Sequence, residues 1–268
     1  SKALENYQTE LSTRRQTGLE QFFESEEERR EFQLRHALAK IDPPDLPEGS
    51  VLPVYIGIDA GSTTSKLVLL DEQEQVIDSF YANNDGEPLQ VLKEGLLSVY
   101  RRWKERGIAL EVLGVGTTGY GEKLFGAAFK ADYHTVETVA HAEAAMHYLP
   151  GASFILDIGG QDMKAISVSN DIVTGITLNE ACSAGCGSFL ESFARSLEIP
   201  VAEIAPRAFA ASNPSKLGSR CTVFMNSSII TEQKNGKGPN DIMAGLCRSI
   251  IENVFTKVVR VSNMSVLG

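Results

Sequence analysis

The chain has 268 residues, of which 43% are hydrophobic and 22% are charged, so its composition excludes a disordered or collagen-like protein. Acidic residues outnumber basic ones by 35 to 25, and we expect no nucleic-acid partner because phosphate backbones are bound by basic surfaces. No apolar run approaches the ~20 residues of a membrane-spanning helix and no secretory leader opens the chain, so we expect a cytoplasmic protein without a membrane partner.

Residues 1–50 are predicted to form a charged helical lead-in or linker. Apolar side chains recur there at loose helical spacing among many charged ones, at Leu19, Phe22, Phe23, Phe32 and Leu34. Several prolines between residues 43 and 53 end any helix, which places a domain boundary near residue 50. A lead-in of this kind fits a domain cut from a longer polypeptide.

The rest of the chain alternates short β-branched runs with longer amphipathic stretches, which predicts an α/β fold. In residues 51–150, strands are predicted at 54–58, 66–70, 75–81 and 110–115, and helices at 89–106 and 137–148. In residues 151–268, strands are predicted at 154–156, 163–168 and 172–177, and helices up to about 197, at 200–211 and at 240–261.

The order of strand, Asp-x-Gly turn, strand and strand occurs twice. The aspartates that precede the two turns, Asp59 and Asp157, lie 98 positions apart (157 − 59). A duplication on this scale predicts two related lobes, residues 51–150 and 151–268, with a cleft between them.

Both turns carry groups suited to a nucleotide triphosphate. Glycine-rich turns expose backbone N–H groups to phosphate, and hydroxyls add to them. The expected nucleotide-binding residues are Gly61, Ser62, Thr63 and Thr64 in the first turn and Gly159 and Gly160 in the second. Asp59 and Asp157 would hold hydrated Mg²⁺, and Gln161 would orient the attacking water. The alternative is that both are ordinary hairpin turns, in which Asp-Gly is common.

A further glycine run, residues 114–119, fits the G-x-G-x-x-G pattern of dinucleotide-binding folds. It does not follow the first strand of the domain, and Tyr120 and Gly121 are expected to continue the turn instead of opening a helix. We therefore interpret this run, and Gly119 in particular, as a third loop at the nucleotide site. No G-x-x-x-x-G-K-[ST] motif occurs, which excludes a P-loop enzyme.

The four cysteines all lie in the last third of the chain. Cys182 and Cys186 belong to a glycine-rich loop that leads into a helix, Cys221 belongs to another loop, and Cys247 is expected in a helix core. A helix N-terminus favours thiolates and anionic groups such as an iron–sulfur cluster. Two loop thiols per chain are too few for a cluster with four cysteine ligands, but a two-fold dimer would double them.

Four runs together resemble the CoA-substrate-specific enzyme activases, over about residues 54–268. They are residues 56–66 (IGIDAGSTTSK), 156–162 (LDIGGQD), 181–190 (ACSAGCGSFL) and 221–224 (CTVF). This family includes activators of 2-hydroxyacyl-CoA dehydratases and ATPase subunits of benzoyl-CoA reductases. The resemblance implies an actin-like ATPase fold made of two duplicated ribonuclease-H-like lobes.

The resemblance also implies a homodimer with one 4Fe–4S cluster bridging the subunits through Cys182 and Cys221. By the same resemblance, Lys66 is expected to be one of the ATP-binding residues. Such proteins accept an electron from ferredoxin or flavodoxin. They couple ATP hydrolysis to one-electron reduction of a CoA-ester dehydratase or reductase.

Two features depart from the family pattern. Cys186 stands where many small activators have threonine, so it is either an alternative cluster ligand or a bystander. The chain ends before the strand, glycine pair and final helix of family members, so the second lobe is expected to be incomplete. Two other functions are compatible with the residues, a non-catalytic nucleotide-sensing domain of a larger protein and a small-molecule kinase of the same fold.

Overall fold

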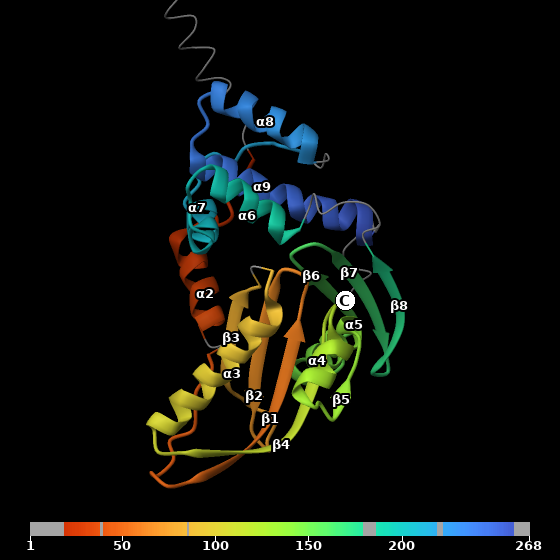
Figure 1. Ribbon diagram of the computed structural model, residues 1–268. Helices are drawn as coiled ribbons and strands as arrows, with labels where there is room; N and C mark the ends of the chain where they lie inside the picture. Colours follow the sequence, from red (N-terminus) through yellow and green to blue (C-terminus); the bar gives the residue numbers. More distant parts are fainter. Residues whose placement is uncertain (1–18, 38–39, 85, 179–185, 219–221, 260–268) are drawn as a thin grey trace, which may run out of the picture. The chain divides into compact units, whose positions relative to one another are not determined.

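The computed structural model describes residues 19–37, 40–84, 86–178, 186–218 and 222–259. The chain divides into two units, residues 35–148 (the β1–β5 unit) and residues 149–268 together with 1–34 (the β6–β8 unit). The division at residue 34 falls within helix α2 (Glu26–Ala37). Each unit combines a sheet with helices, which confirms the predicted α/β class (Figure 1). None of the helices in these ranges is long and apolar enough to cross a membrane.

The β1–β5 unit is built on a five-stranded sheet with the strand order β3-β2-β1-β4-β5. Its strands are β1 (Val51–Ala60), β2 (Thr64–Leu70), β3 (Val76–Asn83), β4 (Ala109–Thr118) and β5 (Tyr133–His134). The first three form an antiparallel meander, and β4 and β5 run parallel to β1. The meander excludes the dinucleotide-binding fold, whose sheet is mostly parallel.

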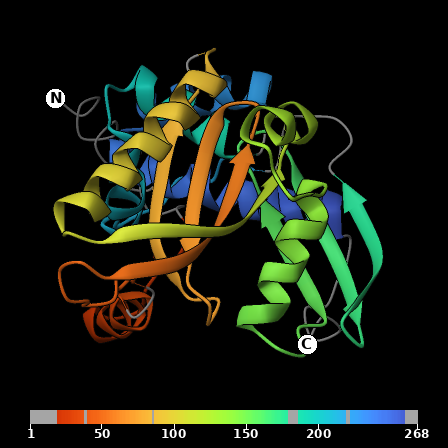
Figure 2. The ribbon, with the colours of Figure 1, turned by 60° about the horizontal axis from the view of Figure 1, so that its bottom comes forward.

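Helices α3 (Pro88–Glu105), α4 (Glu122–Phe129) and α5 (Glu137–Tyr148) complete this unit (Figure 2). Leu67 and Leu69 are buried on β2, and they share a core with Leu92 and Trp103 of α3. Because side chains of a strand alternate between faces, Lys66, which directly precedes Leu67, lies on the opposite face of the sheet. The candidate site lies on that opposite face.

The β6–β8 unit contains a second, three-stranded antiparallel sheet. Its strands are β6 (Phe154–Ile158), β7 (Met163–Ser169) and β8 (Ile172–Leu178). Its helices are α6 (Gly187–Ser196), the 3₁₀ turn η2 (Val201–Glu203), α7 (Ile204–Phe209), α8 (Thr222–Lys234), α9 (Pro239–Asn253) and the π-helical η3 (Val254–Val259). Contacts of η3 with β7 and β8 join these helices to the sheet.

The lead-in residues from 19 onward pack against the β6–β8 unit, although they are distant from it in sequence. The rings of Phe22, Phe23 and Phe32 surround that of Phe209, with centroid distances of 5.8, 5.1 and 5.6 Å. The guanidinium of Arg248 lies 5.0 Å from the Phe22 ring centroid and donates to backbone carbonyls of this segment. Aromatic contacts of this kind therefore attach to the β6–β8 unit a segment that we predicted as a charged helical lead-in or linker.

Most predicted strands and helices are confirmed to within a few residues, and the exceptions have local causes. The helical pattern predicted over 200–211 is confirmed over Val201–Phe209, but its first turn is 3₁₀ and not α-helical. Pro206 accounts for this difference, because it lacks an N–H and its ring would clash with the carbonyl four residues earlier in an α-helix. Tyr120 and Gly121 continue the turn as predicted, but helix α4, which was not predicted, begins directly after them at Glu122. Helix α8 and the short strand β5 were not predicted.

Candidate functional site

The loop between β1 and β2 carries the first predicted phosphate-binding turn. The amide of Gly61 donates to the Thr64 carbonyl at 3.0 Å and closes the turn, and Ser62 and Thr63 are exposed at its tip. Since the Gly61 amide is used within the turn, phosphate contacts from this loop depend on the amides and hydroxyls that follow it.

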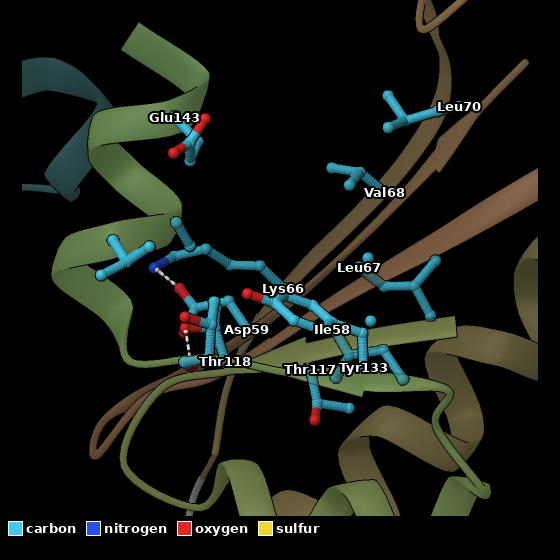
Figure 3. A pocket seen from close by; sticks show the side chains of 15 residues that line it. Ile58, Asp59, Lys66, Leu67, Val68, Leu70, Thr117, Thr118, Tyr133 and Glu143 are labelled. Carbon is cyan, nitrogen blue, oxygen red and sulfur yellow. Dashed lines mark hydrogen bonds and ion pairs between the residues drawn. The ribbon is translucent and has the colours of Figure 1, made fainter. Parts of the chain in front are cut away.

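Asp59 and Lys66 face each other across β1 and β2 and form an ion pair (Figure 3). The Lys66 Nζ donates to Asp59 Oδ2 at 2.6 Å. The other carboxylate oxygen, Oδ1, is buried and accepts no hydrogen bond from the residues that the structure describes. A buried acceptor without a donor costs about 1–3 kcal/mol, so a cation or donor that reached Oδ1 would be stabilised. Asp59 therefore fits the predicted role of holding hydrated Mg²⁺.

Asn84, just after β3, holds the first turn through hydrogen bonds. The sequence analysis did not single out this residue. Its side-chain amide donates to the Gly61 carbonyl at 2.7 Å, and its backbone amide donates to the Thr63 carbonyl at 2.8 Å. Its Oδ1 accepts a hydrogen bond from the Ser65 hydroxyl at 2.6 Å. Asn84 is buried, so these bonds are shielded from water and hold the turn in one conformation.

The loop after β4 lies against the first turn. Gly119 has φ +93°, and a Cβ at this position would come within 2.6 Å of the Ala60 carbonyl oxygen and of Asp59 Oδ1. The Gly121 amide donates to the same Ala60 carbonyl at 3.4 Å. The structure brings Gly119 next to Asp59, and its contact with nucleotide stays a prediction.

We expect Gly119→Ala to destabilise the β1–β5 unit and to weaken nucleotide binding. A left-handed conformation costs a non-glycine residue about 1–2 kcal/mol, and the clash with Asp59 and Ala60 adds about 1–3 kcal/mol. Gly86→Ala is the matched control, since Gly86 has φ +84° and nothing within 4 Å of an added Cβ. Urea unfolding of the two variants measures the difference. Equal losses of stability would contradict the close approach at Gly119.

The loop between β6 and β7 repeats the first turn 98 positions later (159 − 61). The Gly159 amide donates to the Asp162 carbonyl at 2.9 Å, as Gly61 does to Thr64. Asp157 lies on β6, the first strand of its sheet, and pairs in register with Lys164 of β7, as Asp59 pairs with Lys66. The predicted duplication thus extends to individual hydrogen bonds.

Two further predicted site residues, Gly160 and Gln161, belong to this turn. Gly160 and Gln161 are both exposed at the tip of the loop. The role of Gln161 toward water stays a prediction. Lys164 was not singled out by the sequence analysis, and its side chain lies 3.0 Å from an oxygen of Asp162 and 3.6 Å from one of Asp157.

Helix α6 is joined to the second turn by backbone hydrogen bonds. The amide of Gly187 donates to the Gly159 carbonyl at 3.0 Å, and the amide of Ser188 donates to the Gly160 carbonyl at 2.9 Å. The first N–H groups of a helix have no partner within the helix, and here the turn between β6 and β7 satisfies two of them. The turn and the start of α6 therefore have to move together.

Cys186 is the residue at the N-terminal cap of α6, and its side chain is fully buried. It packs in a hydrophobic cluster with Met163, Ala165, Ile250 and Val254. This environment favours its interpretation as a core residue over that of a cluster ligand. The two predicted cluster ligands, Cys182 and Cys221, lie outside the described residues.

Cys247 lies on α9 and is mostly buried, and burial raises the pKa of its thiol to about 11 from an ordinary value of 9.0. At about pH 8 its thiolate fraction is then about a hundredfold lower than that of an ordinary thiol, and the thiolate is the reactive form. We expect iodoacetamide to leave Cys247 unmodified in the folded protein and to modify it in guanidinium chloride, as peptide mass spectrometry would measure. Rapid modification in the folded protein would contradict the burial.

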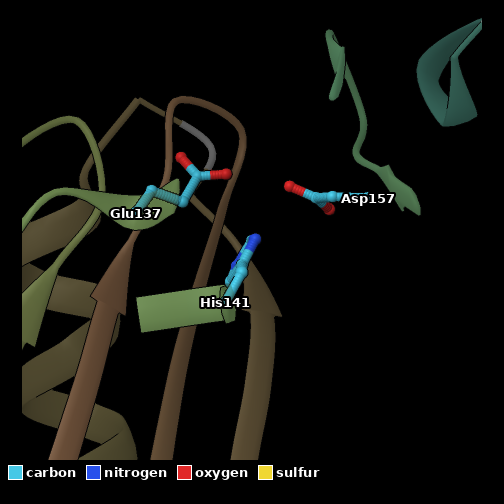
Figure 4. A group of neighbouring side chains, drawn as sticks. All are labelled: Glu137, His141 and Asp157. Atoms are coloured by element: carbon cyan, nitrogen blue, oxygen red, sulfur yellow. The ribbon is translucent and has the colours of Figure 1, made fainter. Parts of the chain in front are cut away.

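A cavity of about 440 Å³ lies between the sheet of the β1–β5 unit and α5. Its lining is largely apolar, and Asp59, Lys66 and Glu143 are its charged side chains (Figure 3). On the same helix, Glu137 and His141 lie one turn apart, so their side chains project from the same side of α5 (Figure 4). The sequence analysis predicted none of these α5 residues.

Each unit therefore combines three antiparallel strands with an acidic glycine turn between the first two, and this repeated arrangement defines an ATPase of the actin-like class. The chain belongs to the BadF/BadG/BcrA/BcrD ATPase family, which matches residues 56–266. This result confirms the fold and the family resemblance that the four sequence runs indicated.

Individual relatives agree with this assignment. The (R)-2-hydroxyglutaryl-CoA dehydratase activating ATPase of Acidaminococcus fermentans is 34% identical over 209 residues, which cover 77% of each chain. The 2-hydroxyisocaproyl-CoA dehydratase activator of Clostridioides difficile is 31% identical over 211 residues, or 77% of this chain and 76% of the relative. The crystal structure of component A of the Acidaminococcus fermentans dehydratase superposes with a TM-score of 0.66 at 29% identity, and the match covers 79% of this chain and 80% of that one.

A second solved structure is that of the Clostridium difficile activator of 2-hydroxyisocaproyl-CoA dehydratase with bound ADPNP. It superposes with a TM-score of 0.65 at 29% identity and covers 76% of this chain and 74% of that one.

Proposed function

We propose that this chain is an ATP-dependent activator that delivers single electrons to a partner enzyme acting on CoA esters. Its relatives include activators of three 2-hydroxyacyl-CoA dehydratases and a component of the benzoyl-CoA reductase of Thauera aromatica, and they support this role. The observation that carries the proposal is the acidic turn, present twice with the same hydrogen bond and the same Asp–Lys register, in a chain whose sequence also has Cys182 and Cys221 in the runs that resemble the family.

The proposed ATPase site uses both turns. Asp59 and Asp157 would hold a hydrated Mg²⁺, which supplies positive charge to the phosphates. Ser62, Thr63, Thr64 and Lys66 of one turn and Gly160 of the other would contact the phosphates. Gly61 and Gly159, whose amides close the two turns, would let the backbone approach the phosphates closely. Gln161 would orient the water that attacks the terminal phosphate.

The proposed redox site is a 4Fe–4S cluster held by Cys182 and Cys221 of two copies of the chain. Each copy supplies two thiolates, so a two-fold dimer provides the four that such a cluster requires. Ferredoxin or flavodoxin is the proposed electron donor, and the cytoplasm the proposed compartment, since it contains both donors and CoA esters.

The backbone joint between the second turn and α6 supports coupling between these two sites. The predicted cluster ligand Cys182 precedes α6 by five positions, counted to Gly187, and the turn at Gly159 is hydrogen-bonded to the same end of that helix. A change in the turn on nucleotide binding would therefore be transmitted to the start of α6. The coupling would pass through backbone hydrogen bonds alone, without any side chain of the four residues that they join.

Anaerobic reconstitution with iron and sulfide tests the proposal. We expect brown protein with about four iron atoms per dimer, and oxidation of the reduced cluster by a 2-hydroxyacyl-CoA dehydratase only when ATP is present. A protein that binds ADPNP but no iron would overturn the redox function and would favour a nucleotide-sensing domain. ATP-dependent phosphorylation of a sugar by protein lacking Cys182 and Cys221 would favour a kinase instead.

A further inference from the structure

Lys164 is a buried lysine beside the second phosphate-binding turn. Its side chain is 7% exposed, and its Nζ lies 3.0 Å from Asp162 Oδ2 and 3.6 Å from Asp157 Oδ2. The corresponding lysine of the first turn, Lys66, is 44% exposed and pairs with Asp59. The two turns therefore share a cross-strand Asp–Lys pair, but only in the second does one buried ammonium lie within 4 Å of two carboxylates.

The positive charge of Lys164 and the negative charges of Asp157 and Asp162 stabilise one another. Neighbouring carboxylates repel each other, more strongly where one of them is mostly buried, as Asp157 is at 16% exposure beside the 48% of Asp162. A buried ammonium is tolerated only when it is paired. An ammonium between them satisfies both conditions and occupies the position that a cation would otherwise take. The β7 backbone fixes the start of this side chain, because Lys164 pairs in register with Asp157 on one side and with Leu178 on the other.

We propose that Lys164 is a positioning residue that keeps Asp157 and Asp162 from binding a divalent cation until nucleotide brings one. Its ammonium compensates the two negative charges and holds the carboxylates on either side of the turn. The proposal rests on the proposed nucleotide site. Only a site that receives its cation together with phosphates requires a residue that prevents cation binding before the nucleotide arrives.

Binding of Mn²⁺ in the absence of nucleotide tests this role, with the electron paramagnetic resonance signal of free Mn²⁺ as the readout. We expect Lys164→Met to bind Mn²⁺ about tenfold more tightly than the unmodified protein, since removing a charge 3.0 to 3.6 Å from the carboxylates removes their compensation. Lys164→Arg should behave as the unmodified protein does. The double variant Lys164→Met with Asp162→Asn should lose most of the gain.

Controls separate this effect from instability. Lys237→Met removes another buried lysine of the same unit, whose Nζ donates to the Asn213 carbonyl at 2.8 Å, and should leave Mn²⁺ binding unchanged. Lys164→Gln, which still donates hydrogen bonds without a charge, replaces Lys164→Met if the latter does not fold. A folded Lys164→Met or Lys164→Gln protein that binds Mn²⁺ as weakly as the unmodified one overturns the proposal.

The outcome is distinguishable from failure of the proposed function. If the unmodified protein does not bind ADPNP, the nucleotide site is wrong, whatever the Mn²⁺ titration gives. If it binds ADPNP and the Lys164 variants show no gain in Mn²⁺ affinity, the nucleotide site stands and only the role of Lys164 is wrong.

Discussion

Cys182→Ser is expected to abolish the iron–sulfur cluster in anaerobically reconstituted protein and to leave ADPNP binding unchanged. Thiolates are the ligands that hold such clusters, and a dimer that loses one thiol per chain retains only half of them. The two cysteines that the structure describes are poor substitutes. Cys186 is fully buried among apolar side chains, and the pKa of Cys247 is raised to about 11 by burial. Iron analysis and the visible absorbance of the cluster measure the effect.

Cys247→Ser is the matched control for this experiment and should retain the full iron content. Cys221→Ser should lose the cluster as Cys182→Ser does. A cluster that survives in Cys182→Ser but is lost when Cys186 is also replaced would identify Cys186 as the ligand, and it would contradict the assignment of Cys182.

Asp59→Asn is expected to lower ATP hydrolysis by about a hundredfold or more while changing ADPNP affinity only a few-fold. Groups that stabilise charge in the transition state are commonly worth factors of about 10²–10³ in rate. An amide keeps the shape of the side chain but removes the negative charge with which Asp59 would hold hydrated Mg²⁺. The new NH₂ group would also replace one of two acceptor oxygens, either the buried Oδ1 or the Oδ2 that accepts from Lys66. Steady-state phosphate release at saturating ATP and Mg²⁺ measures the rate.

Asp78→Asn is the control for loss of a carboxylate from the same sheet. Asp78 lies on β3, where it accepts hydrogen bonds from Arg102 and from the indole N–H of Trp103. Its replacement should cost about 1–3 kcal/mol of stability and leave the rate of hydrolysis per folded molecule unchanged. If Asp59→Asn hydrolyses ATP as fast as Asp78→Asn, the proposed role of Asp59 is wrong.

The sequence predicted the strands well because their signals are local. β1, β2 and β7 are short runs of β-branched and aliphatic residues, and α3 shows the helical spacing of Leu92, Val99 and Trp103. Helix α8 was missed because its apolar and polar residues do not separate into two faces, so periodicity gives no signal. Helix α4 was missed because it is short and begins directly after a glycine-rich turn.

The site was predicted only where residues that are adjacent in sequence carry the chemistry. Asp59, Asp157 and their glycines belong to contiguous motifs. Asn84 is 23 positions from Gly61, to which it donates, and Gly187 is 28 positions from Gly159. Contacts over such separations are set by the topology of the sheet, and no local pattern specifies them. Lys164 could have been found from the 98-residue offset, since it stands where the repeat places the counterpart of Lys66.

The aromatic contacts of the lead-in make it part of the same structural unit as the β6–β8 sheet. The family match begins at residue 56, yet the ring of Phe209 in the β6–β8 unit packs against rings that precede that point by more than twenty positions. Recombination at the family boundary would leave Phe209 and Arg248 without their aromatic neighbours and would expose apolar surface to water. The lead-in and the β6–β8 unit therefore form one compact unit that is continuous in space and interrupted in sequence.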